Sequence, residues 1–465
     1  MTGNLVIAAL GVRVRIVCDG LGDSVAAAAH EAWQDARTDA AALGPADVEV
    51  VAGGGGSIRS LLSSLSQRVT LAAIEAQRGH AWMLHAAGVA LPDGRVVALV
   101  GPSGRGKTTA ARVLGRAYAY VSDETVAIDS SGGVHAFRKP LSIIEPGEPD
   151  KAQRSPSALG LGELPEPELR LAGVVLLDRR DGVSGAAVSG AVVSEVDLGD
   201  ALEDLVAQSS YLADLPAPLR TIAAHVASVG GVRRVTYTDA ADLVRVIPEV
   251  AAGSPSAPRV PAPSVHAAVS ADAAGEQAFR RVAALDELAL DDPDRVALLH
   301  VDDEGVGTVR VLAGIAPALW RAADGVGLEA LAAAAVSEYG APEGTDAATA
   351  VAAAVEDLVA SGVLRESSGS SGVVDAPIWR INDDIAWTGE VPRIVVLALA
   401  DPAASPLALE GSAALIWSAL AEGPGRAHDI VRRVAEAAEV DGDVIRDDVE
   451  SFLGTLRDQD LVFTG

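Results

Sequence analysis

Residues 96–124 read VVALVGPSGRGKTTAARVLGRAYAYVSDE, and this stretch decides the fold. At its centre, residues 101–108 fit the phosphate-binding motif G-x-x-x-x-G-K-[ST] at every position. The apolar run Val96–Val100 predicts a buried strand before the loop, and the residues from Thr109 onward predict a helix after it. Glycines let the backbone turn so that successive N–H groups face a phosphate, and the helix N-terminus adds a partial positive charge. We therefore expect a P-loop that binds a nucleoside triphosphate.

The residues of this loop have distinct expected roles. Lys107 should reach the β- and γ-phosphates, and the Thr108 hydroxyl should bind Mg²⁺. A glycine-rich connection without a ligand is the alternative, which the complete motif between a strand and a helix disfavours. The predicted nucleotide-binding residues are Gly101, Ser103, Gly104, Arg105, Gly106, Lys107, Thr108 and Thr109.

Two carboxylates, Asp123 and Glu124, follow the next predicted strand. Acidic residues at the C-terminal end of a strand lie in the crevice where α/β sheets bind ligands. Asp123 is therefore a candidate Mg²⁺ ligand or a candidate acceptor for the proton of an attacking hydroxyl, and Glu124 is a candidate for the other role. A solvent-exposed turn is the alternative. Farther on, Arg138 and Lys139 are candidate contacts for phosphate or substrate, unless they belong to an exposed loop.

The order of His85, the P-loop and Tyr120-Val-Ser-Asp-Glu124 resembles the C-terminal catalytic domain of HPr kinase/phosphorylase and its wider family. The resemblance covers roughly residues 80–250. It implies a compact P-loop fold related to phosphoenolpyruvate carboxykinase and the ATP-dependent phosphorylation of a protein or peptide hydroxyl. Asp123 matches the acid/base aspartate of that family, and His85 matches the histidine beside it.

Some positions depart from the pattern of that family. Glu124 stands where the family has a second Asp, which changes the reach of the carboxylate by one methylene. Glu168-Leu-Arg170 is a fainter match to the family's Glu-x-Arg segment, so Arg170 is either a substrate contact or part of an ion-paired strand end. His85 has apolar neighbours, and a hydrogen-bonded core residue is its alternative role. An unperturbed imidazole, with a pKa of about 6.5, would suit proton handling.

The composition limits the classes of protein. Hydrophobic residues make up 49% of the 465 residues but aromatic residues only 3%, so the cores must consist of Ala, Val and Leu. A net charge of −28 argues against nucleic acid or an anionic membrane as a partner. The single cysteine, Cys18, excludes an internal disulfide and a thiolate metal cluster. Without an apolar run long enough for a membrane span or a secretory signal, we expect a cytoplasmic protein.

Composition also divides the chain. Strand-like stretches at Val12–Cys18 and Val48–Val51 predict a small β-rich appendage that covers one edge of the nucleotide-binding sheet. Four prolines within residues 251–264 predict a linker. We predict an α+β N-terminal subdomain (1–78), an α/β P-loop domain (79–250), a Pro-rich linker (251–268) and two α+β domains (269–366 and 373–465).

The last two domains are copies of one repeat. Leu312–Trp320 (LAGIAPALW) matches Leu409–Trp417 (LEGSAALIW) at an offset of 97 residues. Leu358–Leu364 (LVASGVL) matches Leu456–Val462 (LRDQDLV) at an offset of 98 residues. Both copies therefore predict paired strands, three helices and a terminal strand.

This plan resembles the PqqD-like domain, a small winged-helix module that serves as the peptide recognition element in ribosomal peptide biosynthesis. In the second copy the resemblance rests on Ala408–Trp417, Ala427–Val434 and Asp447–Leu453, whereas the first copy is degenerate, with Pro317 in its first helix. It implies that a leader peptide adds as a strand to the exposed edge of the sheet, beside one helix. A DNA-binding winged helix is the alternative, which the acidic residues of the predicted helices disfavour.

Together these features predict an ATP- and Mg²⁺-dependent kinase that modifies Ser or Thr in a ribosomally made precursor peptide, while the PqqD-like domains bind its leader. The alternative is a nucleotide-regulated binding or scaffold protein that presents the precursor to a separate biosynthetic enzyme. The oligomeric state stays open, a homo-oligomer included. P-loop kinases of the HPr type often form rings, but the sequence does not give a number of subunits.

Overall fold

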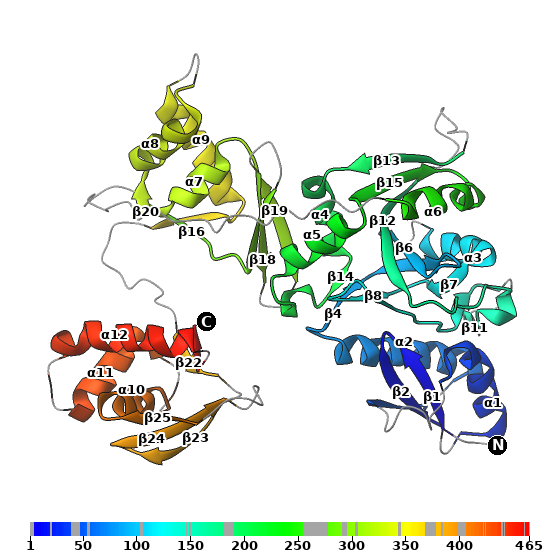
Figure 1. The fold of residues 1–465 in the computed structure, drawn as a ribbon, viewed down its shortest axis with the longest axis horizontal. Helices are drawn as coiled ribbons and strands as arrows, with labels where there is room; N and C mark the ends of the chain where they lie inside the picture. The colour runs from blue at the N-terminus through cyan, green and yellow to red at the C-terminus, as the bar shows by residue number, and fades with distance from the viewer. Residues whose placement is uncertain are drawn as a thin grey trace. The chain divides into compact units, whose positions relative to one another are not determined.

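A computed structural model gives the structure of the chain (Figure 1). It divides into two compact units, Met1–Ser368 and Gly369–Gly465, and the boundary falls in the stretch SSGSSG at residues 367–372. The structure describes residues 4–18, 21–38, 47–53, 56–102, 106–145, 147, 150–180, 190–253, 278–290, 295–302, 306–342, 346–367, 378–382, 385–398, 406–421, 423, 425–438, 440, 442–459 and 461–464.

The first unit begins with a small α+β layer. Its sheet has the order β1-β2-β3, in which β2 pairs antiparallel with β1 and parallel with β3. The sequence predicted β2 and β3 but not β1, whose alanines have a weak strand propensity. The elements of this layer are β1 (Leu5–Ala9), β2 (Val12–Val17), α1 (Asp23–Ala32), β3 (Val48–Val51) and α2 (Ile58–Ala76).

A six-stranded sheet with the order β13-β15-β12-β6-β5-β7 is the centre of the P-loop part. Strands β6, β12 and β15 run parallel, so their carboxyl ends share one edge, and β13, β5 and β7 pair antiparallel with their neighbours. The strands are β5 (Ala86–Ala90), β6 (Arg95–Val100), β7 (Ala119–Ser122), β12 (Arg170–Arg179), β13 (Val192–Val196) and β15 (Val232–Tyr237).

Helices contact both faces of this sheet. Because side chains alternate along a strand, Val96 of β6 belongs to the core shared with α4 and α5, and Val97 belongs to the core shared with α3 and α6. The near-continuous apolar sequence of β6 is thus explained by burial on both faces. The helices are α3 (Lys107–Ala117), α4 (Leu198–Ala207), α5 (Pro218–Ser228) and α6 (Leu243–Ala251).

A second, four-stranded antiparallel sheet has the order β14-β4-β8-β9. The chain passes from this sheet to the central one between β4 and β5, and returns between β7 and β8. Since β4 pairs with β8 and β5 with β7, the two crossings lie beside each other. The remaining strands of this part are β4 (Ala81–Leu84), β8 (Val126–Asp129), β9 (Val134–His135), β14 (Ser209–Ser210) and the paired β10 (Leu141–Ile143) and β11 (Ala152–Arg154).

The two copies of the sequence repeat have the same element order and strand pairing. Each contains a three-stranded antiparallel sheet, three helices and a second sheet that joins its first, fifth and last strands. The first copy consists of β16 (Ala278–Arg281), β17 (Asp286–Leu290), β18 (Arg295–Val301), β19 (Gly307–Leu312), α7 (Ala316–Ala322), β20 (Asp324–Gly327), α8 (Leu328–Tyr339), α9 (Ala347–Ala360) and β21 (Leu364–Ser367). The second consists of β22 (Ile378–Ile381), β23 (Ile385–Glu390), β24 (Arg393–Ala398), β25 (Leu407–Glu410), α10 (Ser412–Ala421), β26 (Gly425–Arg426), α11 (Ala427–Ala438), α12 (Gly442–Asp458) and β27 (Val462–Thr464).

The tryptophans of the repeat lie at equivalent places. Trp320 on α7 and Trp417 on α10 are both buried in the core of their own copy. The offset seen in the sequence thus corresponds to a repeat in the structure.

The first copy is attached to the P-loop part within the first unit. Leu299 of β18 belongs to the same core as Leu202 of α4 and Ile222 of α5. Asp286, whose side chain is 2% exposed, accepts a hydrogen bond of 2.8 Å from the backbone N–H of Leu219 at the start of α5. Most of the predicted linker lies outside the described residues. No helix in the described part of the chain is long and apolar enough to cross a membrane.

Candidate active site

The predicted loop lies between β6 and α3. Gly101 follows β6 directly, and Gly106 precedes the first residue of α3 with φ of +94°, a left-handed conformation that favours glycine. Ser103, Gly104 and Arg105 lie outside the described residues. The described part thus has the strand-loop-helix arrangement that the motif requires.

Lys107 is buried at the start of α3, with 7% of its surface exposed. Its Nζ donates a hydrogen bond to the backbone carbonyl of Gly101, so the ammonium group folds back over the loop. Burial lowers the pKa of Lys107, and the charge of Glu124 acts in the opposite direction. A phosphate oxygen could replace the carbonyl as the acceptor of this ammonium group.

One cavity of about 490 Å³ joins most of the predicted site residues. It brings the start of α3 together with the two crossings between the sheets. Its lining includes Gly106, Lys107, Thr108, Thr109, His85, Asp123, Glu124 and Lys139.

Asp123 lies at the crossing between β7 and β8 and is buried, with 8% of its surface exposed. Its Oδ1 accepts a hydrogen bond of 2.9 Å from the hydroxyl of Tyr120, which is itself fully buried. Burial raises the pKa of Asp123, and the charge of Lys139 and the Tyr120 hydroxyl oppose this shift. The carboxylate therefore does not face open solvent.

Glu124 is more exposed and forms an ion pair with Lys139. The side chain of Lys139 is only 8% exposed, whereas that of Glu124 is 38% exposed. The backbone N–H groups of Glu124 and Thr125 both donate to the hydroxyl of Ser122 at 3.2 Å, which fixes the turn. Lys139 is thus a cation of the cavity lining that is paired with the acidic residues at this crossing.

His85 lies at the other crossing, between β4 and β5. Its backbone N–H donates to the carbonyl of Gln208 at 2.6 Å. Burial is the main cause that lowers the pKa of His85, and the nearby charge of Lys107 adds to it. The imidazole is therefore neutral at pH 7 and can exchange a proton or a hydrogen bond inside the cavity.

The donor set of this cavity fits Mg²⁺. The Thr108 hydroxyl and the Asp123 carboxylate are hard oxygen donors, and Mg²⁺ is usually bound through one or two carboxylates together with phosphate oxygens and water. Among the described residues, no group of three or more His, Cys, Asp or Glu side chains could hold a metal alone. A Mg²⁺ ion here would complete its coordination with phosphate oxygens or water.

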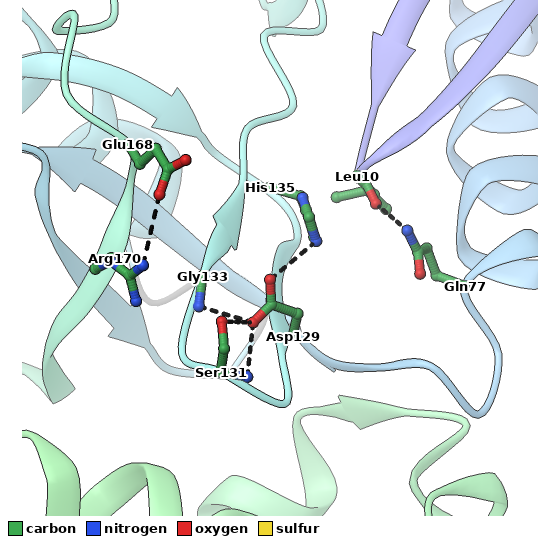
Figure 2. A network of polar contacts seen from close by, with 8 residues as sticks. All are labelled: Leu10, Gln77, Asp129, Ser131, Gly133, His135, Glu168 and Arg170. Atoms are coloured by element: carbon green, nitrogen blue, oxygen red, sulfur yellow. Dashed lines mark hydrogen bonds and ion pairs between the residues drawn. The ribbon is translucent and has the colours of Figure 1, made fainter.

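Arg138 and Arg170 are not in the cavity. The guanidinium of Arg138 donates to the backbone carbonyls of Tyr120 and Gly162, both at 2.8 Å, and its burial lowers its pKa. Arg170 begins β12 and forms an ion pair of 3.5 Å with Glu168, beside the turn at Ser131 (Figure 2). Since β12 runs parallel to β6, its first residue lies at the edge of the sheet opposite the P-loop.

Other residues of the cavity were not found from the sequence. Three of them, Ser63, Ser66 and Gln67, come from α2 of the N-terminal layer, and Ser142 and Lys151 lie in or beside β10 and β11. Serines on an amphipathic helix look like its solvent face, so the sequence contains no signal that sets these apart. The N-terminal layer was expected only to cover a sheet edge.

A second cavity, of about 270 Å³, lies at the beginning of the loop. It is lined by Gly101 and Pro102, by the end of β12 and by Arg234 of β15. These strands lie on the side of β6 away from β5 and β7, which lead to the acidic pair. The two described ends of the loop therefore line different cavities, each with charged residues in its lining.

Comparisons with known proteins find two kinds of similarity. The chain is similar to the solved structure of TbiB1 in complex with the TbiA(beta) leader peptide, with 26% identity over 18% of this chain and 93% of that chain and a TM-score of 0.16. It is also similar to the HPr(Ser) kinase/phosphatase from Coxiella burnetii, with 11% identity over 36% of this chain and 92% of that chain and a TM-score of 0.20. No curated protein matches the chain. Residues 395–462 match the family model of Coenzyme PQQ synthesis protein D (PqqD), which confirms the resemblance predicted for the second copy: this part of the chain is a PqqD domain.

Proposed function

We propose that the protein is an ATP- and Mg²⁺-dependent kinase that phosphorylates Ser or Thr of a ribosomally made precursor peptide, whose leader is bound by the PqqD domain. The observation that carries the proposal is one cavity that contains the P-loop lysine Lys107, the Thr108 hydroxyl and the buried carboxylate of Asp123. Phosphoryl transfer to a hydroxyl needs a phosphate clamp, a metal site and a proton acceptor within reach of one another.

The residues of the cavity have separate roles in this reaction. Lys107 would leave the carbonyl of Gly101 for the β- and γ-phosphates, and Thr108 and Asp123 would hold Mg²⁺ there, which would neutralise charge on the phosphates. The acceptor oxygen bonds to the γ-phosphorus, the bond to the bridging oxygen of ADP breaks, and the hydroxyl proton passes to the Asp123 carboxylate.

Glu124 and Lys139 have a supporting role in the proposal. Their ion pair keeps a cation directed at the region where the transferred phosphoryl group would lie. The neutral imidazole of His85 adds a hydrogen-bonding group without a second positive charge beside Lys107.

The two copies of the repeat would have different tasks. We assign the first copy as a degenerate PqqD-like winged helix, because its elements and pairings repeat those of the second. Its three-stranded sheet packs against α4 and α5, so it braces the P-loop part. In the second copy, β25 is an edge strand with Leu407 39% exposed, and there a leader peptide can add as a further strand.

The proposal is tested by transfer of label. The full chain is incubated with Mg²⁺, γ-labelled ATP and the short peptide encoded beside its gene. We expect label on Ser or Thr of the peptide, and a loss of about 10²- to 10⁴-fold in rate with Asp123→Asn. Tight binding of the peptide without any transfer would refute the kinase and favour a nucleotide-regulated scaffold instead.

A further inference from the structure

We infer that α2 of the N-terminal layer forms one wall of the cavity that contains Lys107 and Asp123, and that Ser66 and Gln67 contact the γ-phosphate of the bound nucleotide. This inference rests on the proposed function, because it takes a nucleoside triphosphate as the ligand of the cavity. It assigns the N-terminal layer a part in the site rather than in the fold alone.

The position of α2 is the first observation. Ser63, Ser66 and Gln67 line the same cavity as Lys107 and Thr108. Residues three and four apart lie on one face of a helix, so this face of α2 is turned toward the loop. Its side chains there are two hydroxyls and an amide, all without charge.

The hydroxyl of Ser66 is the second observation. Ser66 is 3% exposed, and its Oγ is buried without a hydrogen-bond partner in the described part of the chain. A serine or threonine inside a helix can bond the carbonyl four residues back, as Thr70 does with Ser66 at 2.9 Å. Ser66 does not do so, and a buried hydroxyl without a partner is costly. A ligand oxygen in the cavity would supply the missing acceptor.

Contacts at both ends hold α2 in place, those at its beginning with the P-loop part and the one beyond its end within the N-terminal layer. At its beginning, Arg59 forms an ion pair of 2.6 Å with Glu145, and Ser57 donates a hydrogen bond of 2.7 Å to Asp150, which lies beside β11. Just beyond its end, the side-chain N–H of Gln77 donates at 2.7 Å to the carbonyl of Leu10 in the turn between β1 and β2 (Figure 2). Donors held in this way need no reorganisation when a charged group binds.

The chemistry of the cavity selects the γ-phosphate. Three ammonium groups line it, from Lys107, Lys139 and Lys151, against the two carboxylates of the acidic pair, and α2 adds hydroxyl and amide donors. Such a set binds an anion rich in oxygen. Because the N–H groups of a P-loop enclose the β-phosphate themselves, donors from a separate element meet the phosphate that projects beyond the loop.

Binding of two nucleotides tests the inference. Calorimetric titration of the full chain with AMP-PNP and with ADP, both with Mg²⁺, is compared for the unaltered protein and Ser66→Ala. We expect Ser66→Ala to weaken AMP-PNP about tenfold and to leave ADP unchanged, because only AMP-PNP carries the γ-phosphate. Gln67→Ala should show the same selectivity. Ser64→Ala is the matched control, since Ser64 lies on the exposed face of α2 and should alter neither affinity.

The outcomes separate the two proposals. If Ser66→Ala weakens both nucleotides equally, or neither, the inference about α2 is overturned and the proposed kinase is untouched. If the unaltered chain binds neither nucleotide, the proposed function and the inference are refuted together. Retained binding of ADP also shows that the variant is folded, so misfolding cannot imitate the expected result.

Discussion

The carboxylate of Asp123 costs stability at neutral pH. Burial raises the pKa of this carboxyl, although Lys139 and Tyr120 oppose the shift. The folded protein therefore binds the proton more tightly than the unfolded chain does. The ionised form destabilises the fold at pH above the folded pKa, and this cost disappears below the ordinary value of 3.8. Such a cost is common where activity needs a buried charge.

Asp123→Asn should therefore stabilise the protein while it slows transfer by about 10²- to 10⁴-fold. Asn keeps the shape of the side chain and an oxygen acceptor for the Tyr120 hydroxyl, but it removes the buried charge. We expect a higher melting temperature than that of the unaltered protein at pH 8, and a difference that shrinks as the pH falls through the raised pKa. Melting curves between pH 8 and pH 4, without nucleotide, measure this, and a lower melting temperature of the variant at pH 8 would contradict it.

Arg138 and Arg170 make a matched pair of cations outside the cavity. Arg138→Ala would leave the carbonyls of Tyr120 and Gly162 without their buried donor, so we expect a loss of roughly 2–3 kcal/mol in the free energy of unfolding. Arg170→Ala removes only an exposed ion pair and should change that free energy by less than about 0.5 kcal/mol. Urea unfolding measures both. If the folded Arg170→Ala protein bound ATP with a changed affinity, Arg170 would have to be counted among the nucleotide-binding residues.

At the scale of elements, Asp286 joins the first copy of the repeat to α5. Its buried carboxylate accepts from the backbone N–H of Leu219 and from the guanidinium of Arg220, at 2.8 and 3.2 Å. Asp286→Ala should lower the free energy of unfolding by about 1–2 kcal/mol, because it removes a helix cap. The control is Glu203→Ala, at an exposed position of α4. Equal effects of the two variants in urea unfolding would show that this link is unimportant.

Local patterns in the sequence were sufficient to predict most of the elements that line the cavity. The loop, the strand before it and the acidic pair after β7 follow from motif and periodicity. The orientation of the polar face of α2 toward the P-loop was not predictable. It depends on tertiary contacts such as that of Arg59 with Glu145, which are 86 residues apart in the chain. A pattern within one helix cannot show which distant element its polar face meets.

Because the sequence does not show tertiary contacts, it also predicted Arg138 and Arg170 as phosphate or substrate contacts, although neither lines the cavity. Their charge pointed to phosphate, but the partner of a cation is decided by tertiary packing. For Arg138 these partners are backbone carbonyls, and for Arg170 the neighbouring Glu168 is sufficient. Lys139, adjacent to Arg138 in sequence, reaches the cavity and pairs with Glu124.

At the scale of the whole molecule, the residues proposed for phosphoryl transfer and those proposed for peptide recognition belong to different compact units. The P-loop, α2 and the first copy of the repeat lie in Met1–Ser368, and the PqqD domain lies in Gly369–Gly465. Each unit has its own buried core. A peptide bound by its leader would bring its acceptor residue to the cavity at high effective concentration, without any need for tight contacts at the cavity itself.

Removal of residues 369–465 should therefore separate the two roles. The truncated chain keeps every residue of the cavity and the cores of the first unit, so we expect its affinity for AMP-PNP to be unchanged in calorimetric titration. Its KM for the precursor should rise by about 10²-fold, because the acceptor residue must then bind without the leader, while kcat at saturating peptide should stay within a few-fold. Steady-state transfer of label measures both constants. An unchanged KM would mean that the leader is recognised within the first unit, where the edge strand β19 of the first copy would then be the place to examine.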